Sequence, residues 1–188
     1  MRVESWSLQV NNVSEVSMKS VVMVVAPSVF RDEEYAEPKA VLEASGATVV
    51  TASTSAGTVT GRFGLTAEAT VSVADAALGV WDAAVFIGGA GASVFFDDPD
   101  AHGLARRTLA AGGVIGAICI APATLARAGL LQGIRATAFT TQRDDLTARG
   151  ATWRDDPVVV DGHIVTANGP EAASAFGHAI ASALALQP

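Results

Sequence analysis

The sequence predicts an α/β fold in which a mostly parallel sheet is covered by helices on both faces. Apolar runs of four to six residues recur along the chain, and stretches with helical spacing separate most of them. Half of the residues are apolar and only 16% are charged. Strands buried on both faces give such continuous runs, and their alternation with helices is typical of a parallel sheet. The predicted strands are 21–26, 47–52, 83–87, 114–118, 157–160 and 163–167.

The segments between these strands carry helix and turn signals. The spacing predicts a first helix over about 31–45, and Pro38 inside it predicts a kink. Residues 57–73 are rich in Gly and Thr and predict a short hairpin. Asp98 followed by Pro99 predicts the start of another helix, because an aspartate cap and a proline in the first turn both favour a helix N-terminus.

The C-terminal third adds an antiparallel edge to the sheet. Asp161 and Gly162 separate the last two apolar runs, and Asp-Gly is a strong signal for a two-residue hairpin. A final helix is predicted over about 170–185. Without internal repeats or a linker, residues 18–188 are expected to form a single domain, and residues 1–17 a polar extension with little order and no catalytic role.

Composition excludes several classes of partner. The net charge of −7 disfavours nucleic acid, because the few Lys and Arg residues are not concentrated in one stretch. No apolar run approaches the roughly 20 residues that span a bilayer. A single cysteine and an N-terminus unlike a secretory signal indicate the cytoplasm. We therefore expect a small-molecule ligand and no nucleic-acid or membrane partner.

Cys119 is the one obvious nucleophile. It follows the predicted strand 114–118 and opens a segment with helical spacing. The N–H groups of a helix start favour a thiolate, and ligands of open α/β sheets bind beyond the carboxyl ends of the strands. The alternative is a buried cysteine that packs as a small apolar side chain without chemistry.

Two further groups follow strands at the same expected edge. Glu33 and Glu34 come shortly after the first strand. Apolar surroundings would raise the pKa of such a carboxyl group and let it donate a proton toward the sulfur. The alternative is that both are solvated carboxylates in the first turn of a helix, where they only interact favourably with the helix dipole. Gly88 and Gly89 end the third strand, where their N–H groups could approach a ligand or form only a tight turn.

Cofactor and metal sites are not indicated. The run Gly-Gly-Ala-Gly from Gly88 to Gly91 lacks the spacing and the distant acidic residue of a dinucleotide-binding fingerprint. The three histidines, His102, His163 and His178, fit no zinc spacing. We expect neither a cofactor nor a bound metal.

Three segments of the chain together resemble the ThiJ/PfpI superfamily, also called the DJ-one family. They are AICIAPATLARAGLL, the IGG turn and FRDEEYAEPKAVLEASGATVVTAS. The resemblance covers about residues 19–186 and includes the tail VVVDGHIVTANGPEAASAFGHAI. It implies a flavodoxin-like, class I glutamine-amidotransferase-like three-layer sandwich. It also implies assembly as a homodimer or a larger homo-oligomer.

The resemblance assigns roles to particular residues. Cys119 matches the reactive cysteine of the family and Glu34 its site glutamate, while Gly89 and Ile120 match the positions whose N–H groups face the sulfur. In the branch named for an intracellular peptidase, a histidine and a glutamate complete the triad, but this chain has Ile120 and Ser93 at those positions. Phe139 replaces the histidine of the parkinsonism-linked branch.

The expected function is carbonyl chemistry on a small molecule. Ile120, Phe139 and Phe95 or Phe96 would make the mouth of the site apolar, which favours a small uncharged ligand. A Cys119 thiolate would attack an α-oxoaldehyde or related compound in a glyoxalase-like or deglycase-like hydrolase or lyase, with Glu34 moving the proton. The alternatives are a redox sensor or a stress-related, chaperone-like protein acting through oxidation of Cys119, and an inert site. A cysteine peptidase is disfavoured.

Overall fold

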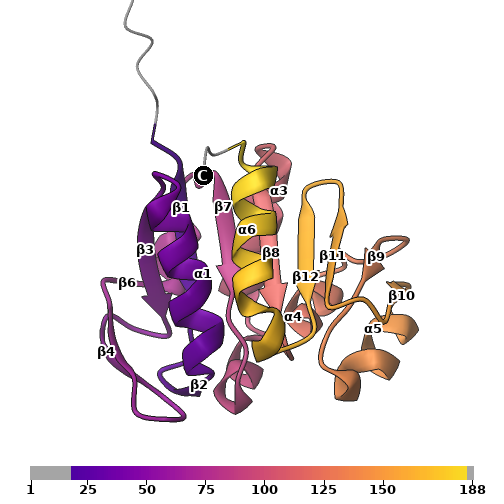
Figure 1. The fold of residues 1–188 in the computed structure, drawn as a ribbon, viewed down its shortest axis with the longest axis horizontal. Helices are drawn as coiled ribbons and strands as arrows, with labels where there is room; N and C mark the ends of the chain where they lie inside the picture. The colour runs from indigo at the N-terminus through magenta and orange to yellow at the C-terminus, as the bar shows by residue number, and fades with distance from the viewer. Residues whose placement is uncertain (1–17, 186–188) are drawn as a thin grey trace, which may run out of the picture.

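A seven-stranded sheet forms the centre of the protein, as a computed structural model that describes residues 18–185 shows (Figure 1). The strand order is β11-β12-β8-β7-β1-β3-β6, and all neighbours are parallel except the hairpin β11–β12 at one edge. The predicted fold class, with its antiparallel edge, is confirmed. The strands are β1 (Ser20–Val24), β3 (Thr48–Ser53), β6 (Val71–Ser72), β7 (Ala83–Phe86), β8 (Val114–Ile118), β11 (Val158–Asp161) and β12 (Ile164–Ala167).

Helices cover both faces of this sheet (Figure 1). One face carries α1 (Asp32–Ala44) and α6 (Ala173–Ala183), which pack closely on each other. The other carries α2 (Val73–Ala76), α3 (Pro99–Ala110) and α4 (Pro122–Arg127). Asp98 caps α3 as the sequence predicts, because its side chain accepts hydrogen bonds from Asp100 N and Ala101 N at 2.8 and 3.2 Å.

Smaller elements flank the central sheet. The predicted hairpin over 57–73 contains β4 (Gly57–Gly61) and β5 (Thr66–Ala69), and β2 (Ser28–Phe30) adds a third strand to it. Beyond α4, β9 (Arg135–Ala136) pairs with β10 (Thr152–Trp153), and α5 (Arg143–Ala148) lies between them in the chain. The short 3₁₀ turns are η1 (Ala90–Phe95), η2 (Thr140–Gln142) and η3 (Pro170–Ala172).

Two helices are shorter than their spacing predicts. The segment after Cys119 forms a helix only over α4, whose six residues are followed by Gly129 at φ 78°. A glycine in this left-handed conformation satisfies the last turn and stops the helix. The final helix begins at Ala173, because Pro170 starts a separate 3₁₀ turn before it.

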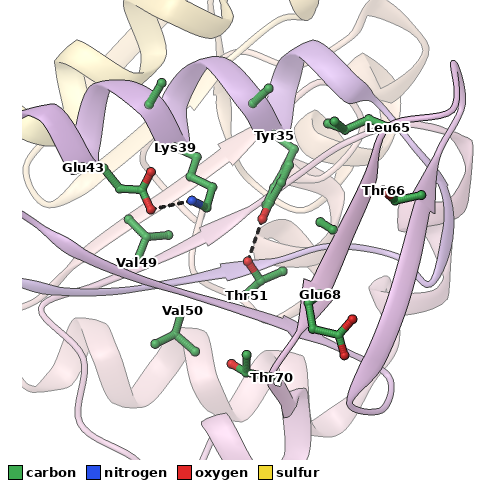
Figure 2. Close-up of a pocket in the computed structure, with 13 residues that line it drawn as sticks. Tyr35, Lys39, Glu43, Val49, Val50, Thr51, Leu65, Thr66, Glu68 and Thr70 are labelled. Carbon is green, nitrogen blue, oxygen red and sulfur yellow. Dashed lines mark hydrogen bonds and ion pairs between the residues drawn. The ribbon is translucent and has the colours of Figure 1, made fainter.

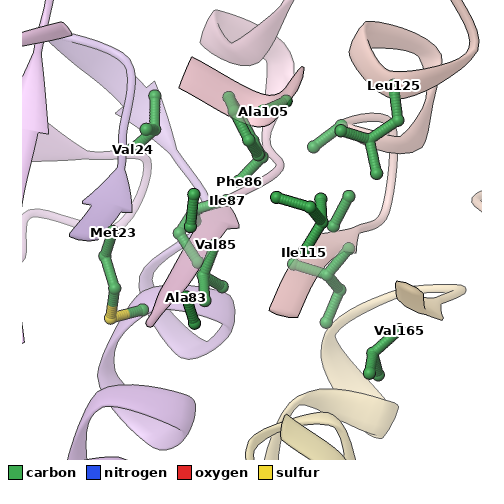
Figure 3. Close-up of a cluster of buried hydrophobic side chains, with 14 of the residues drawn as sticks. Met23, Val24, Ala83, Val85, Phe86, Ile87, Ala105, Ile115, Leu125 and Val165 are labelled. Carbon is green, nitrogen blue, oxygen red and sulfur yellow. The ribbon is translucent and has the colours of Figure 1, made fainter. Parts of the chain in front are cut away.

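The hydrophobic core holds the strand ends that carry the candidate site. Val21 to Val24 of β1, all of β7 and all of β8 are buried, which explains their continuous apolar runs. Figure 3 shows side chains of these strands packing with Ala105 of α3 and Leu125 of α4. Burying each large apolar side chain contributes about 1.5–3 kcal/mol, so the strand ends sit on a rigid base. Within residues 18–185, no helix combines the length and apolarity that crossing a membrane requires.

Candidate functional site

Cys119 lies immediately after β8 in a strained backbone conformation. Its φ of 62° is in the left-handed region, which costs a non-glycine residue of the order of 1–3 kcal/mol. Two long-range bonds hold it there: its N–H donates to Ala167 O at the end of β12 (2.9 Å), and its carbonyl accepts from Phe139 N (2.8 Å). The turn leaves the cysteine partly exposed at the carboxyl edge of the sheet. Strain maintained by the surrounding fold is common at functional sites.

Glu34 of α1 meets Cys119 at this edge although the two are far apart in the sequence. A Cβ built on Gly88 would lie 2.5 Å from Cys119 Cβ and would overlap Glu34 Oε2. Glycine is therefore required at position 88, because only a residue without a side chain lets the thiol and the carboxyl group converge. The Glu34 side chain is completely buried, and neither carboxyl oxygen has a hydrogen-bond partner among the described residues.

Burial raises the pKa of Glu34 to about 7. The nearby Cys119 thiol, the positive charge of Arg31 and the Gly88 N–H each oppose the rise but do not cancel it. The carboxyl group lies near the thiol and this N–H without reaching good hydrogen-bond geometry. Near neutral pH the carboxyl group therefore exists in both forms and can accept or donate a proton.

The pKa of Cys119 moves in the opposite direction to the sequence-based expectation. Burial and the negative charge of Glu34 raise it to about 12, whereas the N–H groups of Gly89 and Ile120 lower it only in part. The expected thiolate is wrong for the resting site, because the sulfur is largely desolvated and lies beside the negative charge of Glu34. The resting pair is a thiol beside a carboxyl group.

Gly89 and Ile120 supply the two backbone N–H groups that face the sulfur. Gly89 has φ 95°, and a Cβ there would lie 2.6 Å from Phe30 C and 2.7 Å from Val29 O. The turn after β7 thus packs directly against the turn before α1, which an additional bond from Arg31 N to Gly88 O (3.0 Å) reinforces. The positions expected from the sequence, Cys119, Glu34, Gly88, Gly89 and Ile120, come together at one edge.

Other expected groups lie apart from the sulfur. Glu33 turns outward to pair with Arg31 Nε at 2.9 Å. Of the two phenylalanines expected at the mouth, Phe95 is 2% exposed and belongs to the core, whereas Phe96 is half-buried with the Arg127 guanidinium 5.0 Å from its ring centroid. Phe139 contacts Cys119 through its backbone while its ring is 44% exposed. The described residues hold no cluster of His, Cys, Asp and Glu that could bind a metal.

Two residues of the site were missed from the sequence. Arg31 acts on Glu34 by its charge and fixes Gly88 through its backbone. Val29, with φ 49°, is a β-branched residue in the left-handed region and forms part of the turn against Gly89. Arg31 directly precedes three acidic residues, and this charge pattern could have indicated from the sequence that Arg31 interacts with one of them. The strain at Val29 has no sequence signal.

A cavity of about 610 Å³ lies on the described part of the chain but does not contain Cys119. Figure 2 shows that α1, β3 and the β4–β5 hairpin surround it. Its polar groups bind each other: Lys39 pairs with Glu43, and the Tyr35 hydroxyl bonds with Thr51 Oγ1 at 2.8 Å. It therefore offers few free groups to a ligand. A smaller cavity of about 200 Å³ lies beside Phe139.

The sheet order and the strand-to-helix cysteine define a flavodoxin-like protein in which a partly exposed cysteine meets a buried glutamate. The chain belongs to the DJ-1/PfpI family, whose model matches residues 19–183. The structure of a ThiJ/PfpI domain protein from Brachyspira murdochii superposes with a TM-score of 0.85 and 30% identity, over 89% of this chain and 97% of that one.

Related sequences carry several kinds of name, and YraA from Bacillus subtilis, 30% identical over 85% of this chain and 95% of its own length, is named a putative cysteine protease. An uncharacterized Methanocaldococcus jannaschii protein, MJ0967, is 34% identical over 97% of this chain and 91% of its own length. The Pyrococcus furiosus deglycase PfpI is 30% identical, over 79% and 90% respectively. The Caenorhabditis elegans glutathione-independent glyoxalase DJR-1.2 is 29% identical, over 89% and 90%. The family thus includes carbonyl-processing enzymes.

Proposed function

We propose that the protein processes small carbonyl compounds, with α-oxoaldehydes as the substrate class, through Cys119 and Glu34. The observation that carries the proposal is the convergence of one thiol, one carboxyl group with a pKa of about 7, and the N–H groups of Gly89 and Ile120. This arrangement supplies a nucleophile, a proton carrier and hydrogen-bond donors for a developing oxyanion.

The first step follows from the protonation states of the resting site. The Glu34 carboxylate takes the proton of the Cys119 thiol as the sulfur adds to the aldehyde carbon, so a C–S bond forms while the C=O π bond opens. The negative charge passes from sulfur to the substrate oxygen, where the Gly89 and Ile120 N–H groups stabilise it. Glu34 then returns the proton to that oxygen, and the product of the step is a neutral hemithioacetal. A base with a pKa near 7 suits this task at neutral pH.

The names of two relatives support this reaction class, whereas the name of a third suggests peptide hydrolysis, which the residues present in this chain disfavour. One relative is named a deglycase and another a glyoxalase, and both names describe carbonyl chemistry. The positions that hold the triad histidine and glutamate of the peptidase branch carry Ile120 and Ser93 here, and Ser93 Oγ donates to Ala90 O at 3.2 Å. The triad that the peptidase branch uses is therefore incomplete in this chain.

The proposal is tested by following methylglyoxal consumption with purified variants. Cys119→Ala should abolish turnover, and Glu34→Gln should lower it by about 10²–10⁴-fold, the usual contribution of a general base. Glu37→Gln is the matched control, because Glu37 is an exposed glutamate of the same helix and should retain the wild-type rate. Equal turnover by the wild type and Cys119→Ala would contradict the proposal.

The redox alternative makes a separate prediction. Oxidation to sulfinic acid requires thiolate, and the raised pKa of Cys119 keeps the thiolate fraction low at neutral pH. The same raised pKa also limits attack on a carbonyl group without a base, so it is the names of the deglycase and glyoxalase relatives that make carbonyl chemistry the better supported function. A rapid gain of two oxygen atoms in mild peroxide, seen by intact mass and lost in Glu34→Gln, together with no methylglyoxal turnover, would favour sensing instead.

A further inference from the structure

The amino ends of the central strands form a surface at the end of the sheet opposite to Cys119. β1, β7 and β8 all begin there, and Figure 1 shows the C-terminal end of α6 and the turn of the β11–β12 hairpin at the same end. Two cavities, of about 300 and 230 Å³, lie on this surface and share Val114 and Ala183 in their linings. They form one groove, the amino-end groove, which runs from Val80 past Val114 to Val160.

Exposed apolar side chains gather at the amino-end groove. Among the described residues, eight large apolar side chains are exposed, and four of them, Met18, Leu78, Val80 and Val160, lie at this end of the sheet. Val80 lines one cavity and is 84% exposed, and Val160 lines the other. Single exposed apolar side chains are ordinary on a protein surface, but a group of them around a groove indicates a binding surface.

The lining of the groove fits an extended peptide segment. Gly112 and Gly113 contribute bare main chain to it, and a Cβ on Gly113 would lie 2.8 Å from Asp82 O. The Lys19 ammonium pairs with the Asp82 carboxylate at 3.0 Å, so these two charges of the lining balance each other. An extended chain presents apolar side chains on one face and N–H and C=O groups along its edges. Apolar contacts and main-chain polar groups therefore decide what binds here.

The chain itself supplies such a segment at the rim of the groove. Residues 1–17 lie outside the described residues and join the fold next to Lys19, which lines the groove. Trp6, Leu8 and Val10 alternate with polar residues, so they fall on one face of an extended chain. From Trp6 to Lys19 an extended chain covers about 40 Å, whereas strands about 4.8 Å apart give the seven-stranded sheet a width of about 30 Å. The segment is long enough to reach both cavities.

The segment also has a counterpart in a relative. The family model begins at residue 19, but the Methanocaldococcus jannaschii protein MJ0967 aligns with 97% of this chain, which is more than residues 18–188 alone would supply. Most of residues 1–17 are therefore matched in that protein. The extension is thus an addition to the family domain that is not peculiar to this chain.

We propose that residues 1–17 dock in the amino-end groove of their own chain, with Trp6 in one of its two cavities. Docking covers Val80 and Val160, which otherwise face water. It revises the expectation of little order for residues 1–17 and keeps that of no catalytic role, because the groove and Cys119 lie at opposite ends of β8. Terminal segments open at free energies far below that of global unfolding, so the segment leaves the groove before the domain melts.

The test follows the indole N–H signal of Trp6 by NMR in the full chain, assigned with Trp6→Phe. A synthetic peptide of residues 1–17 gives the signal of the undocked segment. We expect a different position in the wild-type protein, with NOEs from the Trp6 ring to the methyl groups of Val80 or Val160. Val80→Asp should lose the NOEs and move the signal to the peptide position. Val94→Asp, at an exposed apolar position outside the groove, is the matched control and should leave the signal in place.

A second pair of variants tests which face of the segment docks. Leu8→Ser removes an apolar side chain from the face that carries Trp6 and should release the segment, whereas Ser7→Ala, on the opposite face, should not. A wild-type Trp6 signal at the peptide position would overturn the docking. Equal responses to Leu8→Ser and Ser7→Ala, or to Val80→Asp and Val94→Asp, would overturn it as well. A Trp6 signal that moves to the peptide position on dilution would assign the groove to the extension of a second copy and contradict docking within one chain.

Discussion

Glu34 is the proton carrier of the proposed reaction, and its burial also lowers the free energy of unfolding when its carboxyl group is ionised. Its carboxyl group is fully buried and, among the described residues, has no hydrogen-bond partner that compensates its negative charge. The folded protein therefore binds the Glu34 proton more tightly than the unfolded chain, with a pKa of about 7 against an ordinary value of 4.5. Stability that depends on this proton is fully present below about pH 4.5 and is lost as the pH rises through about 7.

Glu34→Gln should remove this pH dependence. At about 1.4 kcal/mol per pKa unit, the advantage of the variant over the wild type in free energy of unfolding should grow by roughly 2–3 kcal/mol between about pH 5 and about pH 8. Urea denaturation at the two pH values measures it. Glu37→Gln, at an exposed position of the same helix, is the control and should show no such growth. A constant difference between wild type and Glu34→Gln would mean that Glu34 has an ordinary pKa when folded.

At the scale of single elements, the sequence predicted which strands the site residues follow, but it did not predict the pKa values of those residues. The strand before Cys119 and the glycines after β7 carry clear local signals, and the family resemblance singled out Glu34 over Glu33. The raised pKa of Cys119 could not be predicted, because it depends on burial by distant segments and on the approach of Glu34 from α1. The strained φ angles at Val29 and Cys119 depend on contacts between distant segments.

Two helix glycines should respond with opposite signs to substitution by alanine. Gly177 of α6 faces α1, and a Cβ there would lie 2.8 Å from Pro38 Cα, a backbone atom that cannot yield easily. Gly177→Ala should therefore destabilise the fold by about 1–3 kcal/mol. Gly103 of α3 has nothing within 4 Å of such a Cβ. Gly103→Ala should stabilise by up to about 1 kcal/mol, the gain in helix propensity. Thermal denaturation of both variants checks the prediction, which fails if the signs agree.

At the scale of the whole molecule, Lys19 is the first residue for which contacts with distant segments are described. Lys19 O accepts from Thr48 N at 2.8 Å, and its side chain pairs with Asp82 at 3.0 Å. The predicted extension, residues 1–17, lies outside the described residues. Its deletion should leave the midpoint of thermal unfolding and methylglyoxal turnover nearly unchanged, and a large loss of either would contradict this prediction. Two further expectations, assembly as a homo-oligomer and a cytoplasmic location, stay predictions. Light scattering of the purified protein tests the oligomeric state.

Glu34 must act as a base toward the Cys119 thiol for the proposed chemistry to operate. The most direct measurement is the pH dependence of kcat/KM for methylglyoxal in the wild type and in Glu34→Gln. The carboxylate form is the active one, so the wild-type value should be low in acid and rise with an inflection near pH 7, following the pKa of Glu34. Glu34→Gln should be slow throughout and lack that inflection. An unchanged profile in Glu34→Gln would contradict the role of Glu34 as the base.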